Sequence, residues 1–278
     1  MTTPPQLTDR EALLRHRARA RAAGPALFLH EDAALELEER LNEVNKSFTA
    51  PALITDFPDP WLRVLPGAKV VSDEPVLDLE PDAHDLVVHA FCLHWAEDPV
   101  GQIVQAARAL KPDGLFLAVL FGGQTLHELR AALAEAEAAV SGGLSPRVLP
   151  MGEIRDLGAL LQRGGFALPV ADAVTRKVSY ADPLRLMADL RAMGQGNALA
   201  ARLRRFTPRA VIAEAIARYA TAFAEPGGRV RATFEMVWLT GWKPHESQQK
   251  PLRPGSAQHR LAEALGAAEL PAGEKAPK

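Results

Sequence analysis

The sequence predicts an α/β fold, with a largely parallel sheet, helices on both of its faces and an antiparallel last strand. Three observations support this prediction. Short apolar runs alternate with amphipathic stretches from about residue 48 to residue 180, a pattern typical of strands joined by helical crossovers. The run LFLAVLF (115–121) is wholly apolar, as expected for a strand covered on both faces. The alternating segment RVRATFEMVWLTGW (229–242) follows a helical block, which suits an antiparallel edge strand.

The individual elements follow from local patterns. Apolar residues at helical spacing predict helices over 9–24, 31–48, 98–114, 125–140, 153–166 and two or three more within 183–223. Apolar runs bounded by turn residues predict strands at 51–57, 70–71, 84–91, 115–121 and 229–242, with one or two more within 167–180. Pro99 stands near the start of one predicted helix and Gly114 just past its end, which is the usual asymmetry of helix boundaries.

This pattern divides the chain into three parts. Residues 1–47 are predicted to form an N-terminal helical arm, residues 48–243 a single domain with a helical insertion at about 183–223, and residues 244–278 a loosely ordered tail. The arm carries five arginines within the stretch DREALLRHRARARAAG, relieved by two acidic residues. We expect a solvated helix, and contact with an acidic partner or a membrane surface stays open as an alternative.

Composition excludes several classes of function. The formal net charge of −2 argues against a general nucleic-acid binder, because phosphate contacts require a basic face. Cys92 is the single cysteine, so we expect no intramolecular disulfide and no thiolate metal cluster, in a reducing compartment such as the cytoplasm. No apolar run is long enough for a transmembrane helix, and the N-terminus lacks the apolar core of a signal peptide.

Five short motifs, in this order, identify a family resemblance: LHW (93–95), KPDG (111–114), FGGQTLHELR (121–130), DLGALLQRGGF (156–166) and GWKPHESQ (241–248). Together they resemble class I S-adenosylmethionine-dependent methyltransferases. The chain is most similar to the bacterial malonyl-carrier methyltransferase of biotin synthesis and to the mitochondrial complex I assembly factor 5 family. The resemblance implies a Rossmann-like methyltransferase sheet. It also implies a protein client, such as a subunit of respiratory complex I, with arginine hydroxylation in the mitochondrial branch.

The chain departs from that family after its first predicted strand. Laying the family pattern on the sequence without gaps puts Thr55, Phe57 and Asp59 where a cofactor loop has three glycines, and no glycine lies between Gly24 and Gly67. Glycines in such a loop let the backbone turn sharply and pass close to the ligand. We therefore expect S-adenosylmethionine to bind weakly or not at all.

A second departure lies just downstream. Too few residues separate Asp56 from Lys69 for the family's second strand and its helix. In the family that strand ends in the acid that holds the ribose hydroxyls. The sequence therefore predicts a sheet that is truncated in its cofactor half.

The resemblance and the positions of residues at predicted strand ends together give candidate site residues. On the cofactor side these are Asp73, Glu74, Leu93, His94 and Gly122. Candidates for contact with a client or substrate are Trp95, Gln124, His127, Arg130, Trp242 and His245. Structural explanations stay open for all of them: an exposed strand end, a packed aromatic, a strand-to-helix turn in which Thr125 caps the helix, or solvated charges.

The catalytic residue stays unknown, and metal binding is not expected because two suitably spaced histidines are lacking. Since Asp73, His94 and Gly122 each follow a predicted parallel strand, we expect them to converge on one pocket at the carboxyl ends of the strands.

Three hypotheses remain open at this point. The chain is either an assembly or modification factor with a degenerate cofactor half, an active S-adenosylmethionine-dependent methyltransferase, or an interaction module without chemistry. Cofactor binding separates the second hypothesis from the other two. A modified client separates the first from the third.

Overall fold

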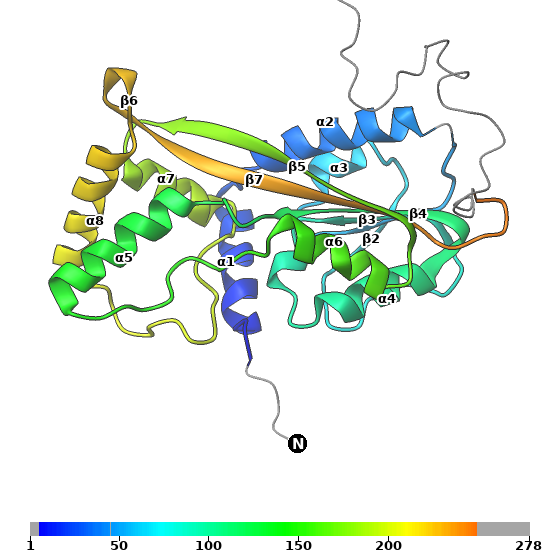
Figure 1. Ribbon diagram of the computed structural model, residues 1–278, viewed down its shortest axis with the longest axis horizontal. Coiled ribbons are helices and arrows are strands. Elements are labelled where there is room, and N and C mark those ends of the chain that lie inside the picture. Colours follow the sequence, from blue (N-terminus) through cyan, green and yellow to red (C-terminus); the bar gives the residue numbers. More distant parts are fainter. Residues whose placement is uncertain (1–5, 45, 249–278) are drawn as a thin grey trace, which may run out of the picture. The chain divides into compact units, whose positions relative to one another are not determined.

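The computed structural model describes residues 6–44 and 46–248. Its centre is a sheet in the order β2-β1-β3-β4-β7-β5, with β6 paired to β7. The strands β1 to β4 are parallel, and β7 runs antiparallel to both β4 and β5 (Figure 1). The strands are β1 (Pro51–Ile54), β2 (Lys69–Val71), β3 (His84–Ala90), β4 (Leu110–Phe121), β5 (Ala167–Tyr180), β6 (Ala224–Glu225) and β7 (Arg229–Trp242).

This topology confirms the predicted α/β fold and its antiparallel last strand. The prediction that 229–242 is the edge strand is wrong, because β7 lies between β4 and β5 and leaves β5 at the edge. The apolar run at 236–239 within β7 explains its interior position, because neighbouring residues of this run face opposite cores. Phe234, Met236 and Trp238 enter the core on one face, and Val237 and Leu239 enter the core on the other.

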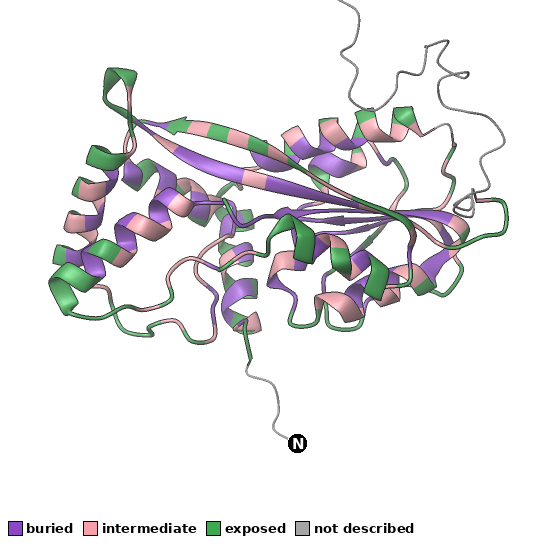
Figure 2. Cartoon of the chain, viewed as in Figure 1, coloured by how far each residue is buried: buried purple, intermediate pink, exposed green. Residues whose placement is uncertain are grey.

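Helices cover both faces of the sheet. The α-helices are α1 (Arg10–Ala23), α2 (Phe28–Glu43), α3 (Asp59–Leu62), α4 (Pro99–Ala109), α5 (His127–Ser141), α6 (Ile154–Arg163), α7 (Pro183–Ala192) and α8 (Arg209–Ala222). Residues of α2, α3, α5, α7 and α8 share one core cluster, and residues of α4 and α6 share the cluster on the opposite face. Figure 2 shows buried residues along one side of helices such as α2 and α5, with exposed residues along the other side. None of the helices in the described ranges is long and apolar enough to cross a bilayer.

The helix predicted over 98–114 is shorter than expected. Asp98 caps it by accepting a hydrogen bond from the backbone N–H of Gly101, and Pro99 occupies its first turn as predicted. The helix ends at Ala109, and the KPDG segment already belongs to β4, where Leu110 pairs with His84. A register shift between His84 and Leu86 absorbs the extra residues.

The cofactor half of the sheet is short, as predicted. Strand β2 pairs directly with β1, Ala52 with Lys69 and Ile54 with Val71. Only α3 and its flanking loops connect the two strands, so within the described residues no strand separates them. The strand that the resemblance matches to the family's third strand therefore lies immediately beside β1.

The other half of the sheet is extended. Strand β7 pairs with β4 only from Met236 to Trp242, whereas its pairing with β5 continues to Val230. Helices α5, α7 and α8 gather around these projecting ends of β5 and β7 (Figure 1). The described part of the predicted helical insertion thus consists of α7 and α8. Most of the predicted loose tail lies outside the described residues.

Candidate functional site

Three ionisable side chains meet at the carboxyl edge of the parallel strands. Asp56 follows β1, Asp73 follows β2 and Cys92 follows β3, each two positions beyond the strand end. Because these strands are parallel and adjacent, their ends bring the three residues together. One oxygen of each acid and the Cys92 sulfur all lie within 4.8 Å of one another.

The guanidinium of Arg17 from α1 occupies this cluster. Its Nη1 lies 2.9 Å from Oδ1 of Asp73 and is also ion-paired with Asp56. The side chains of Arg17 and Asp73 are each only 1% exposed. Helical spacing explains this placement, since Arg17 lies on the same buried face of α1 as Leu13 and Ala20. The two acids thus hold a cation of the chain itself, beside the thiol.

Two further arginines of α1 reinforce the cluster. Arg10 donates to Asp73 at 2.8 Å and to Glu74 at 3.2 Å, and Arg21 lies 3.6 Å from Asp56. The prediction of a solvated arm is therefore wrong for the inward face of α1, because this face must neutralise buried carboxylates. Arg17 Nη2 has no hydrogen-bond partner among the described residues, which leaves one buried donor for a further acceptor atom.

Burial and charge shift the proton affinities of the cluster. Burial alone would raise the pKa of Asp73, but the hydrogen bonds from Arg10 and Arg17 outweigh it and hold the pKa below its usual range. Burial and the neighbouring Asp73 together raise the pKa of Asp56. Burial raises the pKa of the Cys92 thiol well above its ordinary value, so Cys92 is a protonated thiol and a poor nucleophile or metal ligand.

The segment after β1 is filled by side chains. Thr55 and Phe57 stand at two of the positions where the family pattern has glycine, and both are buried. The Phe57 ring packs edge-on against His30 at 5.4 Å, and Trp61 donates from Nε1 to His30 Nδ1 at 3.0 Å. Burial, with the charge of Arg17, lowers the pKa of His30 to about 3. This aromatic group, together with Arg17, occupies the space next to the end of β1.

A cavity of about 390 Å³ remains beside Asp73, on the side where the resemblance places adenine. Arg10, Asp73, Trp95 and Gln102 are among its lining residues. Both carboxylate oxygens of Asp73 accept hydrogen bonds from arginine. Glu74 lies at the same point, half of its side chain exposed, and pairs with Arg10. The acids predicted for the cofactor side are thus already engaged.

The LHW motif forms a short 3-10 helix (Leu93–Trp95) directly after β3. Leu93 is buried in the core, whereas His94 and Trp95 converge on Gln195. The Gln195 Oε1 lies 3.4 Å from His94 Nε2 and accepts from Trp95 Nε1 at 2.7 Å. Burial lowers the pKa of His94 to about 3, so this imidazole is neutral near pH 7.

The turn after β4 has a structural reason for its glycines. The backbone N–H of Gly122 donates to Glu235 O at 2.9 Å, and a side chain at Gly122 would overlap Glu235 and Val237. The hydroxyl of Thr125 donates to Glu235 O at 3.1 Å. The prediction that Thr125 caps the following helix is wrong, since Leu126 is the N-cap residue and has no side-chain cap. Gly122 therefore permits close packing of two strands.

The remaining client candidates do not form a single surface. Gln124 is exposed, and His127 is half-exposed in the first turn of α5. Arg130 donates to the carbonyls of Gly123 and Thr125, which makes it a support for the turn. All of these lie near the carboxyl edge of the parallel strands.

Trp242 lies at the opposite edge of the sheet. It pairs with Leu115 near the start of β4, because β7 is antiparallel, and His245 follows three residues later. The Lys46 Nζ lies 5.4 Å from the centroid of the Trp242 ring. The predicted client residues are thus divided between two edges, whereas Asp73, His94 and Gly122 follow strands whose ends share one edge.

Sequence reasoning missed Arg17 and Asp56. A signal for Arg17 was present, because it interrupts an otherwise small and apolar face of α1 formed by Ala12, Leu13 and Ala20. An arginine on such a face requires a buried partner. The spacing alone could not show which carboxylates would supply it.

Comparison with known proteins identifies relatives. A family model described as a methyltransferase domain matches residues 62–118. The mitochondrial arginine-hydroxylase NDUFAF5 of Danio rerio is 37% identical over 199 residues, which are 72% of this chain and 62% of that protein. The malonyl-[acyl-carrier protein] O-methyltransferase of Halorhodospira halophila is 35% identical over 205 residues, which are 73% of this chain and 67% of that protein. The matched region therefore covers less than two thirds of the NDUFAF5 protein and about two thirds of the methyltransferase.

Among solved structures, the YcgJ protein of Bacillus subtilis aligns with a TM-score of 0.47 and 11% identity, over 77% of this chain and 99% of that one.

Proposed function

Because the chain belongs to the class I S-adenosylmethionine-dependent methyltransferase family that includes NDUFAF5 and malonyl-[acyl-carrier protein] O-methyltransferase, we propose that it acts on a protein client without tight binding of S-adenosylmethionine. The client would be a subunit of respiratory complex I, as the likeness to NDUFAF5 suggests. We propose that the protein works in the cytoplasm as an assembly or modification factor.

One observation carries the proposal about the cofactor. Arg17 lies between Asp56 and Asp73 at the carboxyl ends of β1 and β2, where a bound nucleoside would need free acceptors. The buried Phe57 stands where the family pattern has a glycine. The residues present do not fit S-adenosylmethionine in the manner of an active methyltransferase. The loss of two or three contacts at ~1–2 kcal/mol each weakens affinity roughly 10² to 10⁴-fold.

The buried imidazoles of His30 and His94 are neutral near pH 7 and the Cys92 thiol is protonated, so these groups serve packing and hydrogen bonding. Gln124 is exposed and His127 is half-exposed at the carboxyl edge, so both are accessible to a client. This arrangement favours client binding over small-molecule chemistry.

Calorimetric titration of the full-length protein with S-adenosylmethionine tests the cofactor part of the proposal. We expect no saturable heat at low micromolar concentrations. A dissociation constant in the low micromolar range would contradict the proposal and favour an active methyltransferase. An Arg17→Ala variant that circular dichroism shows to be folded serves as a comparison, because tighter binding to it would show that Arg17 competes with the cofactor.

A deletion strain tests the role in complex I assembly. We expect lower assembled complex I activity without the gene and full rescue by the wild-type protein. Normal assembly in the deletion strain would refute the proposed role. Mass spectrometry of complex I subunits from both strains then separates a modification factor, for which a modification disappears, from a non-catalytic interaction module.

The client candidates lie at two opposite edges of the sheet, so two variants are tested separately in the deletion strain. We expect a Gln124→Ala, His127→Ala double variant to lose rescue if the client meets the carboxyl edge. We expect a Trp242→Ala, His245→Ala double variant to lose it if the client meets the opposite edge. Circular dichroism of each purified variant shows whether it folds. Full rescue by both folded variants would mean that neither set contacts the client.

A further inference from the structure

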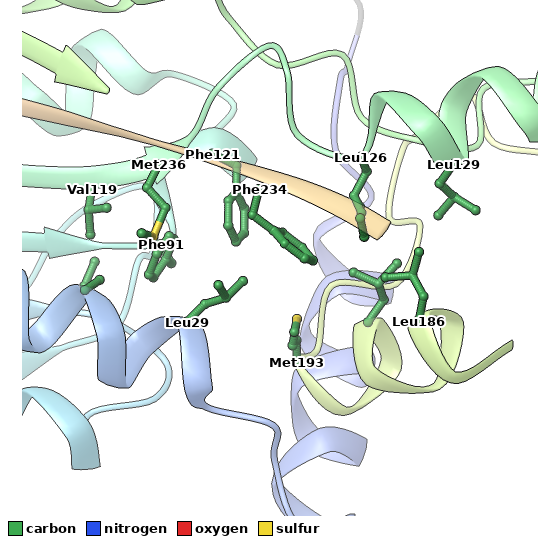
Figure 3. Packing of buried hydrophobic residues seen from close by; sticks show 14 of the residues in the cluster. Leu29, Phe91, Val119, Phe121, Leu126, Leu129, Leu186, Met193, Phe234 and Met236 are labelled. Atoms are coloured by element: carbon green, nitrogen blue, oxygen red, sulfur yellow. The ribbon is translucent and has the colours of Figure 1, made fainter. Parts of the chain in front are cut away.

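A second cavity, of about 290 Å³, lies where α5 and α7 meet the projecting part of β7. Its walls are mostly apolar. They include the methionines Met151 and Met187, whose flexible side chains adapt readily to the shape of a ligand. Figure 3 shows five of its lining residues converging from β4, the turn after it, α5, β7 and the segment after α7: Phe121, Leu126, Leu129, Phe234 and Met193. The volume is at the small end of the range for ligand pockets.

The side-chain oxygens of the polar residues that line this cavity are already engaged. Thr125 Oγ1 donates to Glu235 O and accepts from Glu235 N. Gln195 Oε1 accepts from Trp95 and lies near His94. Asn197 Oδ1 accepts from the backbone N–H of Leu199. A ligand in the cavity would therefore find few acceptors for its own donors.

By contrast, hydrogen-bond donors that line the cavity remain available. Gln195 retains the N–H groups of its amide nitrogen, which has no hydrogen-bond partner among the described residues. Arg191, in the last turn of α7, lines the cavity and forms no ion pair with any described residue. The other lining arginine, Arg147, is neutralised by Glu137 at 2.6 Å and donates to Thr207 at 2.8 Å. The cavity thus offers one unbalanced positive charge and one free amide donor.

Both donors, Arg191 and the Gln195 amide, belong to the C-terminal end of α7 and the residues just after it. Gly194 adopts a φ of 71°, and Gln195 N donates to Leu190 O at 2.9 Å while Gly194 N donates to Arg191 O at 3.1 Å. The helix ends in the manner of a Schellman motif, which satisfies its final carbonyls internally. Arg191 and Gln195 are therefore held on either side of a closed helix end.

We infer that this cavity binds a small monocarboxylate with an aliphatic body, such as a medium-chain fatty acid. The apolar walls would bury the chain, and Arg191 with the Gln195 amide would receive the carboxylate. A single unbalanced arginine matches one negative charge, and hydrogen bonds to charged groups are stronger than neutral ones. The inference does not depend on the proposed function, because it concerns neither S-adenosylmethionine nor the client.

Calorimetric titration of the full-length protein with decanoate and with decanol tests the inference. Trp95 lines the cavity, so tryptophan fluorescence gives a second signal of binding. We expect saturable decanoate binding below the concentration at which it aggregates, and weaker binding of decanol. Absence of saturable decanoate binding, or equal affinity for the two compounds, would overturn the inference.

Arg191→Gln is the decisive variant, and Arg185→Gln is its matched control. Arg185 is an exposed residue of the same helix and does not line the cavity. We expect Arg191→Gln to weaken decanoate binding roughly tenfold or more, with decanol binding unchanged, because a charge-assisted hydrogen bond is lost. Arg185→Gln should bind decanoate like the wild type. An equal effect of the two variants would mean that general surface charge drives binding.

A cavity-filling variant locates the site independently of charge. Met187→Trp enlarges a half-buried side chain in the wall, and circular dichroism shows whether the variant folds. We expect the folded variant to lose decanoate binding. Unchanged binding to it would place the ligand outside this cavity and overturn the inference.

Discussion

Arg17 and Asp73 form an ion pair whose two side chains are each only 1% exposed, with 2.9 Å between Arg17 Nη1 and Asp73 Oδ1. Asp73 is the acid that the family resemblance assigns to the cofactor side. The pair therefore ties the N-terminal helix to the shortened half of the sheet. A change in the charge of either residue would therefore affect both the stability of the fold and the candidate site.

Replacement of Arg17 should be strongly destabilising. Arg17→Leu leaves Asp56 and Asp73 buried without their shared counter-ion, and removal of one partner of a buried pair costs about 3–5 kcal/mol. Urea unfolding measures the change in the free energy of unfolding. Arg15→Leu on the exposed face of α1 is the control, because its pair with Glu11 is solvent-exposed and worth at most ~0.5 kcal/mol.

The same experiment can be extended to show that charge is the cause. Adding Asp56→Asn and Asp73→Asn to Arg17→Leu removes the uncompensated charges, so we expect the triple variant to regain part of the lost stability. A triple variant less stable than Arg17→Leu alone would show that packing of the Arg17 side chain, and not charge, holds α1 in place.

Gly194→Ala should be more destabilising than Gly227→Ala. Both glycines have left-handed backbones, with φ of 71° and 79°, so both substitutions carry the same backbone strain of about 1 kcal/mol. A Cβ at Gly194 would lie 3.2 Å from the Cα of Arg17, whereas one at Gly227 meets nothing within 4 Å. Thermal unfolding of the two variants isolates the cost of the close approach between α1 and the segment after α7. Equal losses would indicate that α1 adjusts freely.

The protein should lose stability in mild acid partly through His30. Its pKa is lowered to about 3 by burial, so the unfolded chain takes up a proton below about pH 6.5 while the folded protein does not. The stabilisation from His30 is present above pH 6.5 and decreases by about 1.4 kcal/mol per pH unit as the pH falls toward 3. At pH 5 the loss relative to pH 7 is about 2 kcal/mol.

His30→Gln is the variant that checks this pH dependence. The amide oxygen can still accept the hydrogen bond from Trp61 Nε1, but glutamine does not titrate. We expect a shallower decrease of unfolding free energy between pH 7 and pH 5 than in the wild type. Identical slopes would assign the acid sensitivity to other groups, such as the buried His89 and His94, whose pKa values are lowered in the same direction.

Gly122→Ala should destabilise the protein through packing alone. The new Cβ would lie 2.6 Å from Val237 Cγ2 and would overlap the Glu235 carboxylate, so strands β4 and β7 must separate locally. We expect a loss of about 1–3 kcal/mol, as for other overpacked sites. Gly143→Ala, where a Cβ meets nothing within 4 Å, is the control and should be nearly neutral.

Much of the fold was determined by local sequence pattern. The apolar run of β4 and the partly alternating segment of β7 predict strands, because short apolar patterns of the β type can be recognised within a single segment. The absence of glycine after β1 predicts the altered loop for a similar reason, since the backbone conformation that a cofactor loop requires is a property of single residues.

Contacts between distant segments were decided only by the tertiary structure. The pattern of α1 marks Arg17 as inward-facing, but docking of α1 on the ends of β1 and β2 selects Asp56 and Asp73 as its partners. The antiparallel direction of β7 places Trp242 at the opposite edge from Gly122, and the order of strands makes β5 the edge. The cavity beside Arg191 arises from the packing of α5, α7 and β7. Such arrangements depend on which apolar faces bury one another, and hydrophobic periodicity within one segment carries no information about its partner.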